Sequence, residues 1–486
     1  MEKFYWIITS SVFITDLAIR IGLSLRVIMR KRSPSVTLAW LVIILLLPFA
    51  GAFIYLLLGE NRIGQKRAAH VANNLPMFKQ WAATLEQRVR VNWNDINPEC
   101  RPIDIQASSI IGLPTVGGND LTLIEKAETF FNALVTDIDK AKVSCYLEFY
   151  IWHEGGQVEE VAAALMRAAS RGVNCKVLLD SIGSDEFLQS SLAEEMKSRG
   201  IQIVEALPAG IFHALFVRID LRNHRKIVII DGEIGYTGSQ NLVDPKYFKQ
   251  DEDVGQWIDT MVRVRGPVVE KMTATFLFDW FVESGISLDD LQDIGEIRPV
   301  AQAGEVPIQL VPSGPGFEED GIHDLLLTTI YAARKELILT TPYFVPDNAI
   351  LAALKSAARR GVDVTIVVPK KNDSRMVHYA SRARYGELTR SGVKIMPFQG
   401  GLLHSKTITV DKDFSLIGSV NLDMRSFWLN FELTLFVYNK DFTTQLRAVQ
   451  QKYIRSSQLL DRKHFDQRSF LLRLKENCAL IVSPLL

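Results

Sequence analysis

The sequence predicts an α/β fold of two similar repeats, each a mixed sheet flanked by helices, preceded by an N-terminal hairpin of two transmembrane helices. Three observations predict this fold. A polar motif occurs twice, apolar strand-like runs alternate with helical patterns around both copies, and two long apolar runs occupy residues 1–60. The chain has 486 residues, which exceeds the size of one hydrophobic core and favours a duplicated domain.

The two N-terminal runs have the length of membrane spans. Residues 36–58 contain no charged side chain, and this run is long enough to cross a bilayer with some tilt. The earlier run, residues 4–25, contains Asp16 and Arg20 one helical turn apart, where they can neutralise each other. No small-residue cleavage pattern follows either run, so we expect a retained anchor in residues 1–60. The flanking basic residues do not decide its orientation.

The charge of the chain is balanced overall but uneven along its length. The chain has 55 basic and 55 acidic residues, a balance that argues against wrapping nucleic acid along the whole length. Residues 1–90 hold 12 Lys or Arg against 4 acids, and residues 440–486 hold 9 against 4. Basic ends suit contact with an anionic membrane surface, although they equally fit residues that flank membrane helices or solvate a terminal helix.

An internal repeat organises the rest of the chain. Residues 224–241 read HRKIVIIDGEIGYTGSQN and residues 404–421 read HSKTITVDKDFSLIGSVN, so His, Lys, Asp, Gly, Ser and Asn recur at one offset. Further out, LEFYIW at 147–152 aligns with TPYFVP at 341–346, and helical patterns follow at 158–171 and 349–360. We predict a basic linker region at 61–110, a first repeat at 111–300 and a second at 301–486.

The two motifs supply matched polar side chains. Residues two apart on a strand project to the same face, so His224 with Lys226, and His404 with Lys406, each present an imidazole beside an ammonium. Asp231 and Asp411 follow seven residues later at strand ends, and we interpret them as structural supports. The four side chains predicted to donate hydrogen bonds to phosphate oxygens are Ser239, Asn241, Ser419 and Asn421.

Such a constellation suits phosphodiester chemistry without a metal or another cofactor, provided that the repeats meet. One histidine would attack phosphorus and the other would protonate the leaving alkoxide. Asp259 and Glu432, downstream of the two motifs, are predicted to hold the imidazoles in one tautomer. A metal site is not expected, because each histidine has a lysine where a second ligand would have to be. The four cysteines lack the paired spacing of zinc ligands or disulfides, and the other six histidines are expected to have ordinary roles.

The twin motifs resemble the HKD signature of the phospholipase D superfamily, from about residue 110 to the C-terminus. The N-terminal runs, LVPSGP at 310–315, LLHSK at 402–406 and LIVSPLL at 480–486 extend the resemblance to the bacterial cardiolipin synthase family. The resemblance implies a membrane enzyme of the bacterial inner membrane that transfers a phosphatidyl group between two phosphatidylglycerols through a phosphohistidine, with phospholipids as its only implied partners. The catalytic positions that it implies are His224, Lys226, Asp231, His404, Lys406 and Asp411.

The sequence leaves other functions open. A hydrolase that releases phosphatidic acid would carry the same motifs, and a membrane-tethered nuclease would need a basic groove that the acidic middle of the chain does not favour. A scaffold without activity would be expected to have lost a catalytic residue. The aromatic stretch 212–216 is either a lipid-facing opening or core, and the segment 465–486 either lies on a membrane or packs on the domain.

Overall fold

A computed structural model describes residues 2–30, 34–60, 89–208, 218, 220–284, 297–318 and 320–482. The chain forms two compact units. The smaller unit comprises residues 1–69 and 209–221, and the larger comprises residues 70–208 and 222–486. Each unit is described by itself. The predicted aromatic stretch 212–216 lies outside the described residues, as do most of the residues predicted as a basic linker.

In its described residues, the smaller unit contains three helices that pack on one another: α1 (Glu2–Met29), α2 (Pro34–Leu46) and α3 (Ala50–Leu58). Val27, Ile44 and Tyr55 form its small core. A polar cluster closes one end, where Glu60 accepts hydrogen bonds from Arg26 at 2.7 Å and from the Tyr55 hydroxyl at 2.8 Å. Most of the large apolar side chains of α1 are exposed.

The apolar run 36–58 is two helices and not one. Helix α2 ends at Leu46 and α3 begins at Ala50. Pro48 lies between them, and proline has no backbone N–H and disfavours helix in the residue before it. The Asp16 carboxylate accepts the freed Phe49 N–H at 2.9 Å and pairs with Arg20, as its spacing predicted. Among the residues described, no helix is both long enough and apolar enough to cross a membrane, so the two predicted spans are not confirmed.

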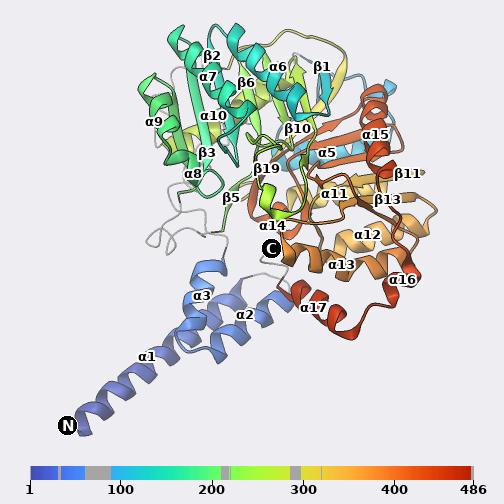
Figure 1. Cartoon of the computed structure of the whole chain (residues 1–486). Coiled ribbons are helices and arrows are strands. Elements are labelled where there is room, and N and C mark those ends of the chain that lie inside the picture. Colours follow the sequence, from blue (N-terminus) through green and yellow to red (C-terminus); the bar gives the residue numbers. More distant parts are fainter. Residues whose placement is uncertain are drawn as a thin grey trace. The chain divides into compact units, whose positions relative to one another are not determined.

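A mixed sheet of 15 strands, one of them the short strand β5 (Arg222–Asn223), forms the centre of the larger unit in the described part of the chain (Figure 1). The first half contributes the strands β1 (Val116–Ile124), β2 (Ser144–Phe149), β3 (Asn174–Asp180), β4 (Gln202–Ala206), β6 (Ile227–Ile230), β7 (Ile234–Gly238) and β9 (Met261–Arg265). The second half contributes β10 (Val306–Ser313), β11 (Glu336–Thr340), β13 (Asp363–Pro369), β14 (Lys394–Phe398), β16 (Thr407–Val410), β17 (Phe414–Gly418) and β19 (Asn430–Val437).

The strand order is the same in both halves. It runs β4-β3-β2-β6-β7-β9-β1 in the first half and β14-β13-β11-β16-β17-β19-β10 in the second, and the antiparallel pair β1 and β10 joins them. The outer strands β2, β3 and β4 are parallel, as are β11, β13 and β14, whereas the inner pairs are antiparallel. The predicted mixed sheet and duplication are therefore confirmed. The boundary at residues 300 and 301 stays a prediction.

Short strands tie the halves together at a second place. Strand β5 (Arg222–Asn223) pairs with β19, and β8 (Trp257–Ile258) pairs with β15 (Leu402–Leu403). Each pair joins a strand of one half to a strand of the other, directly before one of the two histidine motifs. A third pair, β12 (Phe344–Val345) with β18 (Leu422–Asp423), lies within the second half.

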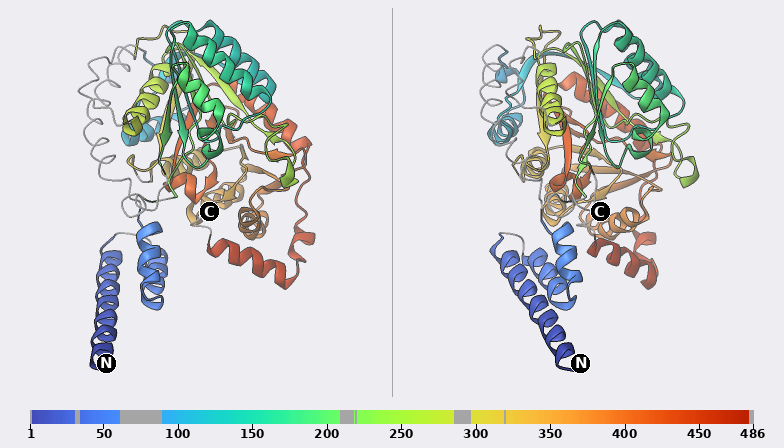
Figure 2. Two further views of the ribbon diagram at one scale, coloured as in Figure 1. Left: turned by 60° about the vertical axis from the view of Figure 1, so that its left-hand side comes forward. Right: turned by 90° about the vertical axis from the view of Figure 1, so that its left-hand side faces the viewer.

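Helices cover the sheet on both faces (Figure 2). In the first half, α6 (Ala127–Lys140), α7 (Gln157–Ser170) and α9 (Ser191–Ser198) share a core with β2 and β3, and α8 (Asp185–Leu188) is a short turn beside them. In the second half the covering helices are α5 (Cys100–Ile111), α11 (Gly321–Ala332), α12 (Asn348–Arg359) and α13 (Arg375–Arg390). The chain ends in α14 (Met424–Trp428), α15 (Lys440–Arg455), α16 (Arg462–Asp466) and α17 (Phe470–Ile481).

The predicted helices at 158–171 and 349–360 are α7 and α12. Val158, Val161 and Leu165 recur at helical spacing on the buried face of α7. The Asp347 side chain caps α12 by accepting the N–H groups of Ala349 and Ile350. Both helices end before a glycine with positive φ, Gly172 and Gly361.

A shared core lies between the halves. Helix α10 (Val268–Ser284) contributes Met272, Phe276 and Trp280, which are buried together with Leu310 and Leu435 of the second half. Such a core cannot close within one repeat, because its apolar side chains come from both. The two repeats therefore share one core, and this packing sets the distance between their motifs.

Candidate active site

The two motif histidines are each anchored to the opposite half by their own backbone. The His224 N–H donates to the Phe431 carbonyl of β19 at 2.9 Å, and the His404 N–H donates to the Ile258 carbonyl of β8 at 2.8 Å. Lys226 and Lys406 each donate from Nζ to the carbonyl of their own histidine residue at 2.7 Å. Each ammonium is thus fixed to the backbone of its own motif histidine.

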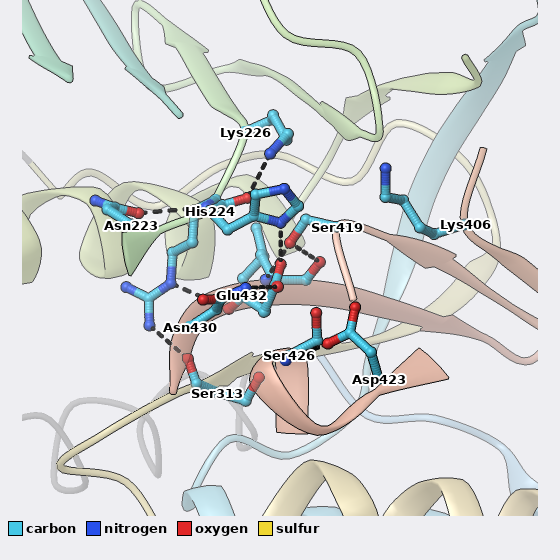
Figure 3. Close-up of polar contacts among 12 residues, drawn as sticks. Asn223, His224, Lys226, Ser313, Lys406, Ser419, Asp423, Ser426, Asn430 and Glu432 are labelled. Carbon is cyan, nitrogen blue, oxygen red and sulfur yellow. Dashed lines mark hydrogen bonds and ion pairs between the residues drawn. The ribbon is translucent and has the colours of Figure 1, made fainter. Parts of the chain in front are cut away.

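The carboxylates pair with the histidines across the halves. His224 Nδ1 lies 2.8 Å from Glu432 Oε2, and His404 Nδ1 lies 2.7 Å from Asp259 Oδ1. All four side chains are buried. A carboxylate that accepts from Nδ1–H leaves the lone pair on Nε2, the nitrogen that can attack or take up a proton. Figure 3 shows the His224 ring bonded to Glu432, while Lys226 donates to the backbone carbonyl of His224.

The serines of the two motifs have a role different from the one predicted. Ser239 Oγ donates to Asp259 Oδ1 at 2.6 Å and accepts the Thr260 N–H at 3.0 Å. Ser419 Oγ accepts the Leu433 N–H at 2.9 Å. Both hydroxyls therefore bond groups in the segments that carry the two carboxylates. Ser239 follows β7, which pairs with the strand β9 just after Asp259, and Ser419 follows β17, which pairs with the strand β19 that contains Glu432. The prediction that they donate to phosphate is not supported.

The asparagines differ from the serines. Asn241 is buried and its Oδ1 accepts the Ile151 N–H at 3.2 Å, whereas its Nδ2 has no hydrogen-bond partner among the described residues. Asn421 is also buried, and its Oδ1 lacks a partner in the same part of the chain. A buried amide donor without a partner is costly unless a ligand satisfies it. Asn241 Nδ2 is therefore a suitable donor to a phosphate oxygen.

Asp231 and Asp411 lie at the opposite ends of their strands from the histidines. The Asp231 carboxylate accepts the backbone N–H groups of Lys142, Val143 and Ser144 at 2.7 to 3.1 Å. Asp411 accepts the equivalent N–H groups of residues 334–336 at 2.7 to 2.8 Å. Both residues have positive φ, at 54° and 53°. They hold the start of the neighbouring strand, and their catalytic assignment by resemblance stays a prediction.

Burial sets the charges of the site. It lowers the pKa of His224 to about 4 and that of His404 to about 3, in spite of the carboxylates that oppose this shift. Burial also lowers the pKa of Lys226 to about 8 and that of Lys406 well below its ordinary value. Burial opposes ionisation of Glu432 and Asp259, but their histidine partners hold both pKa values below the usual range. At neutral pH the resting site combines neutral imidazoles with anionic carboxylates and a cationic Lys226.

Sequence reasoning missed several residues around this centre. The Tyr150 ring lies 5.2 Å from the His224 ring, and the Trp257 ring lies 4.4 Å from the His404 ring. Arg225 is fully buried, donates from Nε to the Glu432 carbonyl at 3.1 Å and pairs with Asp279. A buried arginine inside an H-x-K motif was a signal available in the sequence. The aromatic residues carried none, because each lies in an apolar run typical of a strand.

Other predicted features have ordinary structural roles. Cys100, Cys145 and Cys175 are buried and Cys478 is exposed. His323 bonds Asp347, the residue that caps α12. No cluster of three or more His, Cys, Asp or Glu side chains suited to a metal occurs among the described residues.

The duplicated sheet and the crossed histidine pairs define a protein of the phospholipase D class. The cardiolipin synthase, PLD-like domain model matches residues 134–280 and 326–454, and the phospholipase D-nuclease N-terminal model matches residues 18–60. This chain therefore belongs to the cardiolipin synthase family of phospholipase D-like proteins.

Curated relatives are similar over the full length. The chain is 44% identical over 487 residues to cardiolipin synthase A of Yersinia pseudotuberculosis serotype O:1b, and 43% identical over 486 residues to cardiolipin synthase A of Serratia proteamaculans, with 100% of each chain covered. Among solved structures, phosphatidylserine synthase of Haemophilus influenzae superposes with a TM-score of 0.57 at 15% identity, covering 75% of this chain and 95% of that one. The last comparison concerns the fold alone.

Proposed function

We propose that this protein is a cardiolipin synthase, which transfers the phosphatidyl group of one phosphatidylglycerol to the headgroup of another and releases glycerol. The observation that carries the proposal is the crossed pairing of His224 with Glu432 and His404 with Asp259, beside two lysines. Two imidazoles with free Nε2 atoms are what a two-step displacement at phosphorus requires. The full-length similarity to two cardiolipin synthases supports the choice of lipid.

In the first step His224 Nε2 attacks the phosphorus of a phosphatidylglycerol. A P–N bond forms and the P–O bond to the headgroup glycerol breaks, while the diacylglycerol stays on phosphorus. The protonated His404 Nε2 gives its proton to the departing oxygen. A nucleophilic imidazole must be unprotonated, and the low pKa of His224 meets this requirement at neutral pH, as does that of His404. The choice of His224 as the nucleophile follows the resemblance of its motif to the N-terminal motif of the superfamily. The bound phosphate is negatively charged and adjoins His404, which favours the protonated form of that imidazole.

In the second step a glycerol hydroxyl of a second phosphatidylglycerol attacks the phosphohistidine. His404 removes its proton, the P–N bond breaks, and cardiolipin leaves with His224 restored. Lys226, Lys406 and Asn241 would stabilise the equatorial oxygens of both transition states, since preorganised donors contribute most where charge develops in a buried site. Asp231 and Asp411 are assigned no part in the chemistry.

We further propose that residues 1–60 lie in the inner membrane of a bacterial cell, as a helical hairpin whose second arm is broken at Pro48. The exposed apolar side chains of α1, including Phe4, Trp6 and Phe13, support burial of these helices in lipid. The relatives from Yersinia and Serratia support a bacterial source. Resistance of residues 1–60 to protease in sealed vesicles would test this placement.

The reaction is tested by incubating the purified full chain with phosphatidylglycerol and a chelator, and by identifying the lipid products by mass spectrometry. Cardiolipin and glycerol in equal amounts support the transferase. Phosphatidic acid without cardiolipin would make the protein a hydrolase. No lipid turnover, with cleavage of a single-stranded oligonucleotide instead, would make it a nuclease.

A further inference from the structure

The last described helix, α17 (Phe470–Ile481), has an apolar face that is open to solvent. Leu471, Leu474, Cys478 and Ile481 follow one another at spacings of three, four and three residues, which places them on one side of a helix. Exposed fractions are 68% for Leu471, 47% for Leu474 and 78% for Ile481. Phe470, which adjoins this face, is 69% exposed. Apolar side chains grouped in this way indicate an interaction surface.

The opposite face of α17 is fixed to the catalytic unit. Glu476 is only 1% exposed, accepts from Arg382 of α13 at 2.9 Å, and also pairs with Arg468. Ala479 is buried against Val377 and Ala380 of α13. Helix α17 runs along α13 in Figure 1. A buried ion pair and a packed alanine hold this helix in one orientation, so its apolar face points away from the domain.

One end of α17 packs on the β12 segment of the second half. Leu480 and Ala479 pack in the same cluster as Tyr343 and Val345 of the β12 segment. Strand β12 pairs with β18, which begins at Leu422, the residue after Asn421. The face of α17 that is fixed to the catalytic unit therefore packs on a segment whose partner strand begins beside Asn421.

The charges beside this face are basic. Arg473 and Lys475 of α17 border this face along the helix and are exposed. Glu476, the acid of α17, is buried in its ion pairs on the opposite face. An apolar stripe bordered by Lys and Arg fits the surface of an anionic bilayer, where leucines enter the acyl boundary and cations meet phosphate groups.

We propose that α17 docks the catalytic unit on an anionic phospholipid bilayer, with Leu471, Leu474, Cys478 and Ile481 immersed, so that lipid substrate reaches the site without crossing water. The inference rests on the proposed function, because it takes the bilayer to be the source of the substrate. It makes α17 a positioning element for the reaction and assigns it no chemistry.

Cys478 provides the direct test, since the other three cysteines are buried. The full chain would be labelled there with an environment-sensitive fluorophore and reconstituted in bilayers containing phosphatidylglycerol or only phosphatidylcholine. The proposal expects blue-shifted emission protected from aqueous iodide in the anionic bilayer, and quenchable emission in the neutral one. Emission that stays quenchable in both would overturn it. Emission that shifts in detergent with rising protein concentration, without a bilayer, would also overturn it and indicate contact between copies.

Kinetics give a second test that separates docking from chemistry. Leu471→Asp combined with Leu474→Asp should lower turnover of phosphatidylglycerol in vesicles at least about tenfold, because both side chains lose their place in the lipid. Turnover of a short-chain, monomeric phosphatidylglycerol should stay within about twofold, since the site is untouched. The matched control is Ile105→Asp, an exposed isoleucine of α5, which should leave both rates unchanged.

Equal loss on both substrates by the α17 variant would contradict the docking role. Full vesicle activity of that variant would contradict it as well. If the unaltered protein turns over neither substrate, the proposed function fails, whereas the fluorescence of Cys478 still decides whether α17 enters a bilayer.

Discussion

His404 is held by Asp259, a residue of the other half of the chain, with Nδ1 2.7 Å from Oδ1. The reciprocal pair, His224 with Glu432, has the same geometry at 2.8 Å. Each motif thus depends on the opposite repeat for the group that orients its imidazole. Neither repeat contains both a motif histidine and the carboxylate that bonds it. The crossed pairs explain in structural terms why two copies of one motif make a single site.

The first prediction concerns the carboxylates. Asp259→Asn should lower kcat by about 10²- to 10⁴-fold with little change in KM. An amide favours the wrong tautomer of His404 but leaves the groups that bind the substrate in place. Glu432→Gln should do the same through His224. Steady-state kinetics on phosphatidylglycerol measure both. The control is Asp139→Asn, whose carboxylate forms a half-exposed surface pair with Arg167. Near-normal kcat in the Asp259 variant would mean that the crossed pairing does not orient the histidine.

A second prediction separates the aspartates of the motifs from the histidines. Asp231→Ala removes the acceptor of three backbone N–H groups and should destabilise the protein by about 3 kcal/mol. The folded fraction should retain kcat within about tenfold, since the carboxylate lies at the far end of β6. Denaturant unfolding and kinetics on the same preparation measure the two effects. Loss of kcat without loss of stability would indicate that Asp231 takes part in the reaction.

The third prediction is a pH dependence. The charged form of Lys226 is lost as pH rises through its lowered pKa of about 8, so kcat/KM should fall above that pH. Lys226→Arg should be slower, yet it should remove this alkaline limb because a guanidinium stays protonated. The low pKa of His224 predicts that the nucleophile is not lost by protonation between pH 7 and pH 5. An alkaline limb that persists in Lys226→Arg would assign it to another group.

The fourth prediction tests the amide donor. Asn241→Asp replaces the unpartnered Nδ2 donor by a carboxylate oxygen, which would repel the substrate phosphate. We expect kcat/KM to fall by about 10²- to 10³-fold, as for loss of one donor in a preorganised anion site. Asn430→Asp is the comparison, because Asn430 donates to Glu432 and is not placed at the phosphate. It should impair the His224 pair without the same effect on phosphate affinity, measured with a non-hydrolysable phospholipid analogue.

The sequence sufficed for much of the fold because its signals are local. The paired motifs predicted the duplication, helical periodicity predicted α7 and α12, and the turn at Asp231 predicted a structural carboxylate. One alignment was wrong by two residues: Leu147 pairs with Val228, and the equivalent pair is Leu339 with Ile408. A shift of two leaves the alternation of a strand unchanged, so apolar pattern alone could not detect it.

The arrangement of the site could not be predicted in the same way, because it depends on packing between the halves. Asp259 and Glu432 were recognised as partners of the histidines, but which carboxylate meets which imidazole follows from the shared core and the short strand pairs β5 with β19 and β8 with β15. The occupied hydroxyl of Ser239 has the same origin. Pro48 is the sequence signal for the break in the second apolar run. The apolar residues on both sides of it favoured one continuous helix instead.

The central claim, covalent transfer by His224 with His404 as its proton partner, is tested most directly by single turnover of phosphatidyl-p-nitrophenol. Its leaving group departs without a general acid, so His404→Ala should release one nitrophenolate per site in a burst and accumulate a phosphatidyl adduct on His224, identified by peptide mass spectrometry. His224→Ala should show neither burst nor adduct. A burst that survives in His224→Ala, or turnover by the unaltered protein with no adduct in His404→Ala, would contradict the account.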